Sequence, residues 1–326
     1  ISGGWVISQG PFMGDFGRHL GTLKLRASYG VTGNQGLTGD KEISDFAYLG
    51  LYGTSNYGGN PGIAPSNFAN PNLKWESTHE FDAGLDWYPF GGRLTILADY
   101  YHRLTSDLLV NRPIPAITGF STYWDNIGNV LNRGFELGLS SINFQSPGRD
   151  GFSWTTDFNI TFNHNEVTAL FQNQPFGDGD NFRPISRVAV GDPIGEFYVL
   201  HFLGVDPQTG DAMYKDVNGD GEITSDDRVN AGNPQPKYFG GMRNTFSWKG
   251  LSLGTFLEFS QGAKVFNLMR IFADDGGYNY DNKFTYALNR WQQPGDITNE
   301  PLASFDGTSG AREISDRFIE YGSYLR

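Results

Sequence analysis

The sequence predicts an all-β fold, namely an antiparallel segment of a transmembrane β-barrel with long extracellular loops. Three observations predict it. Long stretches alternate between apolar and polar residues, tight turns alternate with excursions of tens of residues, and a tryptophan stands beside each of three tight turns. Alternation with a period of two is typical of strands, and these stretches exceed the usual ~5–6 residues of globular strands.

The clearest predicted hairpin covers residues 75–107. In its first strand, Phe81, Leu85 and Trp87 share one face, and the other face carries four carboxylates, those of Glu76, Glu80, Asp82 and Asp86. The segment PFGG at residues 89–92 supplies turn chemistry before the second strand. An apolar face opposite a charged face predicts lipid on one side of the sheet and a wet lumen on the other.

Similar alternation predicts about seven full strands in all. The others cover residues 23–33, 94–103, 132–140, 152–163, 238–248 and 251–260. Shorter strands are expected within residues 194–205 and 212–214, and a helical piece around residues 281–292. Residues 1–20 show no clear period, and residues 34–74 are expected to form a loop.

The connections between strands are strongly asymmetric. Short turns at residues 89–92, 145–151 and 249–250 alternate with long excursions, as in outer-membrane barrels with short periplasmic turns and long outer loops. Beside these turns, on the apolar parity, stand Trp87, Trp154 and Trp248. We expect them to form an interfacial aromatic girdle. The alternative is a soluble β-sandwich whose tryptophans fill a core.

Composition narrows the class further. The net charge of −12 and the pI near 4.8 argue against a nucleic-acid partner, which favours a basic face. The chain has no cysteine, so disulfides, a thiol nucleophile and cysteine metal sites are excluded. No apolar run approaches the ~20 residues of a transmembrane helix, an absence that is compatible with barrel strands.

One loop matches a calcium-binding pattern. Residues 216–227 read DVNGDGEITSDD, with oxygen-bearing side chains at positions 1, 3 and 5 and glycine at position 6. The predicted Ca²⁺ ligands are Asp216, Asn218, Asp220, Glu222 (through its backbone carbonyl) and Asp227. Aspartate at position 12 departs from the bidentate glutamate of an EF-hand, and no amphipathic helices flank the loop. The alternative is a turn cluster held by Asx-type hydrogen bonds without an ion.

Several aromatic residues fall in the predicted outer loops. Candidates for stacking on substrate rings are Tyr57, Tyr123, Trp124, Tyr278 and Tyr280. The alternative, which we favour, is that they pack the loops against one another.

Catalysis is not expected. The carboxylates on residues 76–86 suggest glycosidase chemistry, which uses a pair of carboxyl groups. However, they are spread along one strand face, and Lys24 and Arg26 share the lumen parity of the neighbouring strand. Cross-strand ion pairing is the preferred explanation. The five histidines lack metal-ligand spacing.

The chain resembles the C-terminal part of SusC/RagA-type TonB-dependent outer-membrane transporters of Bacteroidetes-like bacteria. The resemblance follows the chain in order through LKLRASYGVTGNQG (23–36), NPNLKWEST (70–78), DYYHRLTSDLL (99–109), NIGNVLNRGFELGL (126–139), GDPIGEFY (191–198), VDPQTGDAMYKDVNGDGEITSDDR (205–228), NPQPKYFGG (233–241), RWQQPGD (290–296) and GSYLR (322–326).

The resemblance implies part of a 22-stranded barrel in the outer membrane of a Gram-negative bacterium. It also implies a lumenal plug pulled by the TonB complex, and a SusD-like lipoprotein that caps the outer loops and hands over a glycan or a peptide. Residues 1–326 are expected to be a partial barrel, since neither plug nor TonB box is recognisable and the family pattern continues past the last residue.

Two other functions remain open from the residues. The first is a non-transporting, calcium-binding surface adhesin or binding protein, and the second is a carbohydrate hydrolase. Specificity for one nutrient would lie in the loops and in a partner.

Overall fold

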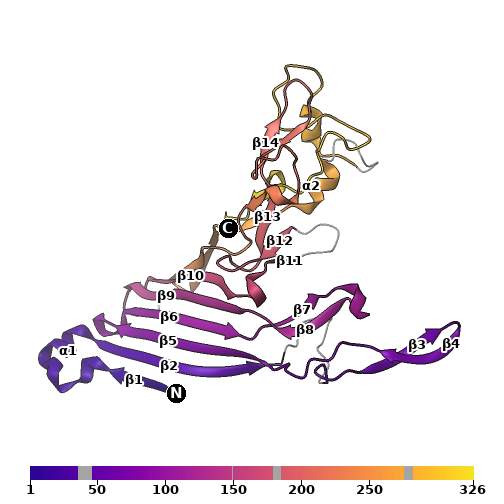
Figure 1. Ribbon diagram of the computed structural model, residues 1–326. Coiled ribbons are helices and arrows are strands. Elements are labelled where there is room, and N and C mark those ends of the chain that lie inside the picture. Colours follow the sequence, from indigo (N-terminus) through magenta and orange to yellow (C-terminus); the bar gives the residue numbers. More distant parts are fainter. Residues whose placement is uncertain (36–45, 149, 179–184, 275–281) are drawn as a thin grey trace. The chain divides into compact units, whose positions relative to one another are not determined.

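The structure is a computed structural model that describes residues 1–35, 46–148, 150–178, 185–274 and 282–326 (Figure 1). These residues fold as two compact units. Unit 1 comprises Ile1–Gln174, Ala189–Asp192 and Gly240–Glu258, and unit 2 comprises Pro175–Val188, Pro193–Phe239 and Phe259–Arg326. None of the described helices combines the length and apolarity needed to cross a bilayer.

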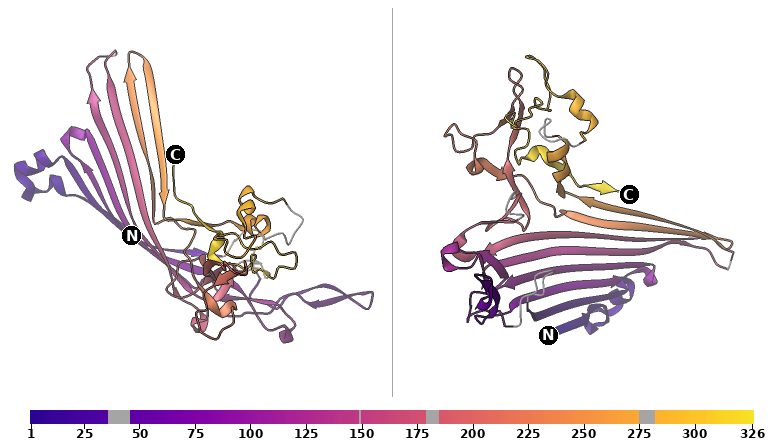
Figure 2. Two further views of the ribbon diagram at one scale, coloured as in Figure 1. Left: turned by 90° about the horizontal axis from the view of Figure 1, so that it is seen from above. Right: turned by 90° about the vertical axis from the view of Figure 1, so that its right-hand side faces the viewer.

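One antiparallel sheet contains all of the long strands. Its spatial order is β1-β2-β5-β6-β9-β10-β17-β18-β21, and Figures 1 and 2 show the long strands lying side by side. The strands are β1 (Ser2–Val6), β2 (Thr22–Asn34), β5 (Glu76–Tyr88), β6 (Leu94–Ser106), β9 (Asn129–Gln145), β10 (Ser153–Ala169), β17 (Tyr238–Trp248), β18 (Leu251–Gln261) and β21 (Tyr324–Leu325). The seven predicted long strands are therefore confirmed.

The register of the sheet keeps the two predicted faces separate. Leu25 pairs with Leu85, and Arg26 with Gly84, across β2 and β5, so apolar residues meet apolar residues and the polar set stays on the other face. Strands β9 and β10 reach 17 residues each. At ~3.3 Å per residue, even a 13-residue strand tilted by ~40° exceeds the ~25 Å apolar band of a barrel.

The regions predicted to lack regular structure contain some. The first 20 residues form β1, two 3₁₀ turns (Ile7–Gln9 and Pro11–Met13) and the helix α1 (Gly14–Leu20). The predicted loop 34–74 contains a hairpin of β3 (Tyr52–Tyr57) and β4 (Asn60–Pro65). Its turn is Gly58-Gly59, both at positive φ, which glycine adopts without the steric cost of a side chain. The alternation rule missed this hairpin because neither of its faces is consistently apolar.

The other excursion in unit 1 also forms a hairpin, of β7 (Leu109–Pro113) and β8 (Thr122–Asn126). Further 3₁₀ turns of this unit are Phe90–Gly92, Ala116–Thr118 and Phe171–Asn173.

Unit 2 consists of short strands and one short helix. A four-stranded sheet has the order β11-β12-β13-β16, and two further strand pairs are β14-β15 and β19-β20. The elements are β11 (Phe176–Asp178), β12 (Ser186–Val188), β13 (Glu196–Leu200), β14 (Phe202–Val205), β15 (Ala212–Tyr214), β16 (Arg228–Asn230), β19 (Lys264–Phe266), α2 (Leu268–Ala273), β20 (Ile319–Tyr321) and the 3₁₀ turns Ser225–Asp227, Thr285–Asn289 and Asp316–Phe318. The strands predicted within 194–205 and 212–214 are confirmed. The helical piece predicted at 281–292 is only a 3₁₀ turn among the described residues.

Unit 2 has an apolar core of its own. Val199, Ile271 and Phe318 are fully buried, and Phe318 packs edge-on against Phe266 with 6.2 Å between ring centroids. This core explains how the three segments of unit 2 hold a fixed structure although their own strands are short.

Candidate functional site

The polar face of the sheet is built around an arginine that crosses a strand. Arg26 on β2 donates from Nε to Asp86 Oδ1 on β5 (2.9 Å) and from Nη2 to Asp99 Oδ1 on β6 (2.8 Å). To reach β6 it lies over Gly84, its paired residue on β5. A Cβ at Gly84 would lie 2.2 Å from Asp99 Oδ1 and 2.8 Å from Arg26 Cζ. The missing side chain of Gly84 is thus what allows the ion pairs to form.

A second long side chain crosses a strand in the same way. The hydroxyl of Tyr101 on β6 donates to Asn163 Oδ1 on β10 (2.8 Å). Between them lies Gly134 of β9, which pairs with both residues. A Cβ there would lie 2.4 Å from the tyrosine oxygen. Gly84 and Gly134, both on the lumen parity, therefore act as gaps through which side chains link alternate strands.

The other wall carboxylates also have partners. Glu80 pairs with Arg103, Asp82 accepts from Ser28 Oγ at 3.3 Å, and Glu76 accepts from Asn34 Nδ2 at 2.9 Å. The ion pairs of Asp86 and Glu80 are the cross-strand ion pairing that the sequence predicted, whereas Asp82 and Glu76 are bound by uncharged donors. Both kinds of bond hold the carboxylates as parts of the wall. We refer to the residues named in this and the two preceding paragraphs as the polar wall.

The three predicted girdle tryptophans lie at the short-turn edge of the sheet, in β5, β10 and β17. Trp87 Nε1 donates to the carbonyl of Leu20 (2.8 Å), and Trp154 Nε1 donates to Asn244 Oδ1 (3.1 Å). Trp248 is 53% exposed, with Lys249 Nζ 4.9 Å from its ring centroid. An exposed apolar ring with a polar edge suits a membrane interface. The girdle itself stays a prediction.

The predicted substrate-binding aromatics differ in their surroundings. Tyr123 on β8 meets Phe68 edge-on at 5.4 Å, and Arg112 lies 5.1 Å from its ring centroid. Burial raises the pKa of the Tyr123 hydroxyl. Trp124 is half-buried, and its backbone carbonyl accepts from Asn70 Nδ2 (3.0 Å). These contacts are the loop packing that we favoured from sequence.

The remaining three aromatics give no such information. Tyr57 ends β3, where it pairs with Asn60. Tyr278 and Tyr280 lie outside the described residues. Substrate binding by any of the five stays a prediction.

The predicted calcium loop is folded by its own side-chain oxygens. Asp216 accepts from the N–H groups of Gly219 (2.6 Å) and Gly221 (2.9 Å), and Asp220 Oδ1 accepts from that of Glu222 (2.8 Å). Asn218 Oδ1 accepts from the N–H of Asp220 (2.9 Å). A carboxylate oxygen has two lone pairs, so these Asx-type bonds are compatible with ligation as well as with an ion-free turn.

Asp227 has a different role from the other predicted ligands. It is fully buried, Oδ1 accepts from the N–H of Val217 (2.8 Å), and Oδ2 accepts from that of Thr224 (2.8 Å). These bonds, led by that from Thr224, lower the pKa of Asp227. Among the described residues, no group of three or more His, Cys, Asp or Glu side chains is arranged to hold a metal. Calcium binding, which would also use Asn218 and backbone oxygens, stays a prediction.

The sequence did not reveal a polar cluster in the core of unit 2. Arg270 Nε and the hydroxyl of Tyr286 both donate to Asp274 Oδ2, each at 2.9 Å. Burial raises the pKa of Tyr286 to about 12 and also raises that of Glu300, which pairs with Arg317. The i, i+4 spacing of Arg270 and Asp274 was a visible signal, but nothing in the sequence indicated that this pair is buried.

Comparison with known proteins identifies the family. A family model described as "TonB dependent receptor-like, beta-barrel" matches residues 19–239. The chain belongs to the TonB-dependent receptor β-barrel family. It is therefore an antiparallel transmembrane β-barrel segment of the SusC/RagA type, as the sequence predicted. That its apolar face meets lipid stays a prediction.

Relatives of this TonB-dependent receptor segment match along its whole length. TonB-dependent receptor P26 of Formosa agariphila is 32% identical over 100% of the chain, and TonB-dependent receptor SusC of Bacteroides thetaiotaomicron is 33% identical over 99%. The solved structure of the RagAB peptide transporter superposes with a TM-score of 0.84 and 28% identity over 100% of the chain. The chain spans only about a third of each relative, at 34%, 32% and 35% respectively.

Proposed function

We propose that this chain forms part of an outer-membrane TonB-dependent transporter that imports glycans or peptides. In this proposal the outer loops bind a SusD-like surface lipoprotein, and the TonB complex acts through a plug that is not part of the described structure. The Bacteroides relative carries the name SusC, and the RagAB structure is described as a peptide transporter. Either cargo class fits the family.

The observation that carries this proposal is the two-faced sheet. Its outer face is apolar and bears exposed aromatics such as Phe81 and Phe135, whereas its inner face is the polar wall. A lumen lined by ion-paired side chains suits the passage or docking of a polar partner in water. Because Asp86 and Asp99 are held by one arginine, the wall carboxylates support a structural role better than a hydrolytic one.

The direct test measures uptake in cells that produce the full-length receptor carrying this chain. Deletion of the receptor, and separately of the TonB complex, should abolish growth on, or uptake of, at least one member of a panel of oligosaccharides and peptides. Purification from mild detergent should yield a surface lipoprotein in a stable complex. If cells that carry the receptor bind the cargo, and deletion of the TonB complex leaves uptake unchanged, the adhesin function is favoured instead. Turnover of a glycan by the purified receptor would favour the hydrolase.

A further inference from the structure

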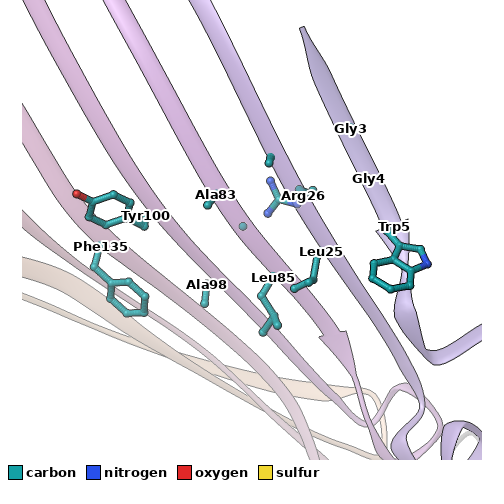
Figure 3. Close-up of a pocket in the computed structure, with 12 residues that line it drawn as sticks. Gly3, Gly4, Trp5, Leu25, Arg26, Ala83, Leu85, Ala98, Tyr100 and Phe135 are labelled. Atoms are coloured by element: carbon teal, nitrogen blue, oxygen red, sulfur yellow. The ribbon is translucent and has the colours of Figure 1, made fainter. Parts of the chain in front are cut away.

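The outer face of the sheet contains a hollow of about 680 Å³ that crosses strands β1, β2, β5, β6 and β9. Figure 3 shows Trp5 at one side of it and Tyr100 and Phe135 at the other. Between them lie Leu25, Ala83, Leu85 and Ala98, with Gly3 and Gly4 of β1 at the edge. Ala27, which pairs with Ala83, also lines the hollow. Arg26 contributes to the lining, but its guanidinium is bound to carboxylates of the polar wall. The hollow is therefore apolar.

Strand register explains the shape of the hollow. Gly3, Ala27 and Ala83 are paired neighbours on β1, β2 and β5, so these three strands carry only small side chains at one level, before Tyr100 of β6. Two residues further toward the loops, the same strands carry the paired rings Tyr29 and Phe81. On the level toward the short turns they carry Trp5, Leu25 and Leu85. The result is a shallow channel with large side chains along both of its sides.

Among the described residues, no protein contact accounts for the missing side chain of Gly3, which lies on the edge strand of the described sheet. A Cβ added at Gly3 would meet no atom within 4 Å, in contrast to Gly84, where the crossing Arg26 requires the space. The large side chains around the channel are exposed on the outer face, with exposed fractions of 55% for Trp5, 43% for Phe81 and 42% for Tyr100. Because this is the predicted lipid-facing side of a transmembrane barrel, what fills the hollow comes from the membrane.

The depth of the hollow indicates which leaflet supplies the occupant. Ala83 lies four residues from Trp87 along β5, a height of roughly 10 Å for ~3.3 Å per residue and a tilt of ~40°. The apolar band of a barrel is ~25 Å tall. The hollow is therefore within the leaflet on the short-turn side and just short of the midplane, where acyl chains rather than headgroups lie.

We propose that this hollow is a binding site for an acyl chain of a phospholipid from the leaflet on the short-turn side. Adjacent rows of side chains on one face of a strand are ~6.6 Å apart, so removing one row leaves a channel of about the width of a single hydrocarbon chain. The acyl chain packs against the methyl groups of Ala27 and Ala83. The ring of Tyr100 closes the channel at β6, and Trp5 flanks its side toward the short turns. Burial of methylene groups against these walls stabilises the contact beyond that of bulk lipid.

Trp5 makes the site observable by fluorescence. The full-length receptor is placed in nanodiscs of phosphatidylethanolamine and phosphatidylglycerol in which a growing fraction carries dibrominated acyl chains. The emission of Trp5 is obtained by subtracting the emission spectrum of the Trp5→Phe variant from that of the parent protein. We expect Trp5 to be quenched at lower fractions of brominated lipid than random contact with bulk lipid gives, and native mass spectrometry to show one retained phospholipid.

Filling the hollow should abolish this preference. Ala83→Phe and Ala27→Phe each place a ring in the channel from a different strand, and both should reduce the excess quenching several-fold. The matched control, Leu139→Phe, adds a ring on the outer face of β9 away from the hollow and should leave it unchanged. Heat-dependent gel mobility identifies the properly assembled variants.

Three results would overturn the proposal. The first is Trp5 quenching in the parent that merely follows bulk lipid composition, a measurement that needs no filling variant. The second is excess quenching that persists in a correctly assembled filled variant. The third is retention of lipopolysaccharide, or of a second receptor copy, in place of a phospholipid.

Discussion

The two faces of the long sheet use the same backbone but follow different rules. On the polar wall, Arg26 and Tyr101 each bind partners on other strands, and their reach depends on glycines at Gly84 and Gly134. On the outer face, side chains such as Phe81 and Leu25 remain exposed, as contact with lipid would require. The difference teaches that the geometry of the wall depends on defined partners across several strands, whereas the exposed side chains of the outer face are constrained mainly by being apolar.

The largest effect should come from placing a charge on the wrong face. Ala27 and Ser28 are neighbours on β2 and point to opposite faces. Ala27→Arg should lower the free energy of unfolding by about 2–4 kcal/mol, because it puts a guanidinium near the bilayer midplane. Ser28→Arg, which faces the polar wall beside Asp82, should change it by no more than about 0.5 kcal/mol. Unfolding of the receptor in urea, followed by fluorescence, measures both.

Equal costs for the two arginines would mean that the faces are not distinguished by lipid and water. A larger cost for Ser28→Arg would reverse the assignment of the faces.

A smaller but more specific effect should come from filling a glycine gap. Gly84→Ala should lower stability by about 1–3 kcal/mol through overpacking, because its Cβ would meet Asp99 and Arg26. Gly138 is on the same wall, but its nearest neighbour to an added Cβ is Leu97 Cβ at 3.7 Å. Gly138→Ala should therefore be neutral. If both substitutions are tolerated alike in the same urea assay, Arg26 does not need the gap.

The predicted calcium loop offers a third contrast, between side chains that supply ligand oxygens and a carboxylate that does not. We expect Ca²⁺ to raise the melting temperature of the receptor and to bind with measurable heat. The double change Asp216→Ala with Asp220→Ala should remove both effects. Asp226→Ala is the control, because position 11 of the loop supplies no ligand. A calcium response that survives the double change would locate the ion elsewhere, and its absence in the parent would leave the Asx-bonded turn without an ion.

The smallest effect should be the local response of the same loop to acid. The pKa of Asp227 is lowered in the folded state, so its carboxylate stabilises the loop above the ordinary aspartate pKa of ~3.9. That contribution is lost as the pH falls through the lowered folded-state value. Hydrogen-exchange protection of the Val217 and Thr224 amides should decline in this acid range, and Asp227→Asn should remove the pH dependence. Acid-sensitive protection in the asparagine variant would assign the effect to another group.

The long strands could be predicted from sequence because one physical rule, alternation between lipid and water, acts on every residue of β5 or β10. The carboxylates of residues 76–86 and their ion pairing followed from the same parity. The crossings over Gly84 and Gly134 could not be predicted, since they depend on which residues lie opposite one another across three strands. The β3–β4 hairpin and the buried pair Arg270–Asp274 were missed because contacts distant in sequence, and no local period, determine them.

The central claim is that adjacent residues of β2 face lipid and water alternately, and spin labelling tests it most directly. The chain has no native cysteine, so Ala27→Cys and Ser28→Cys each introduce a single labelling site into this segment. Each can carry a nitroxide in the full-length receptor in lipid bilayers, after any cysteine elsewhere in the receptor has been replaced by serine. We predict that the label at residue 27 collides mainly with oxygen dissolved in the membrane, and that the label at residue 28 collides mainly with a water-soluble nickel complex. Equal accessibility at the two positions, or the reverse order, would contradict the account.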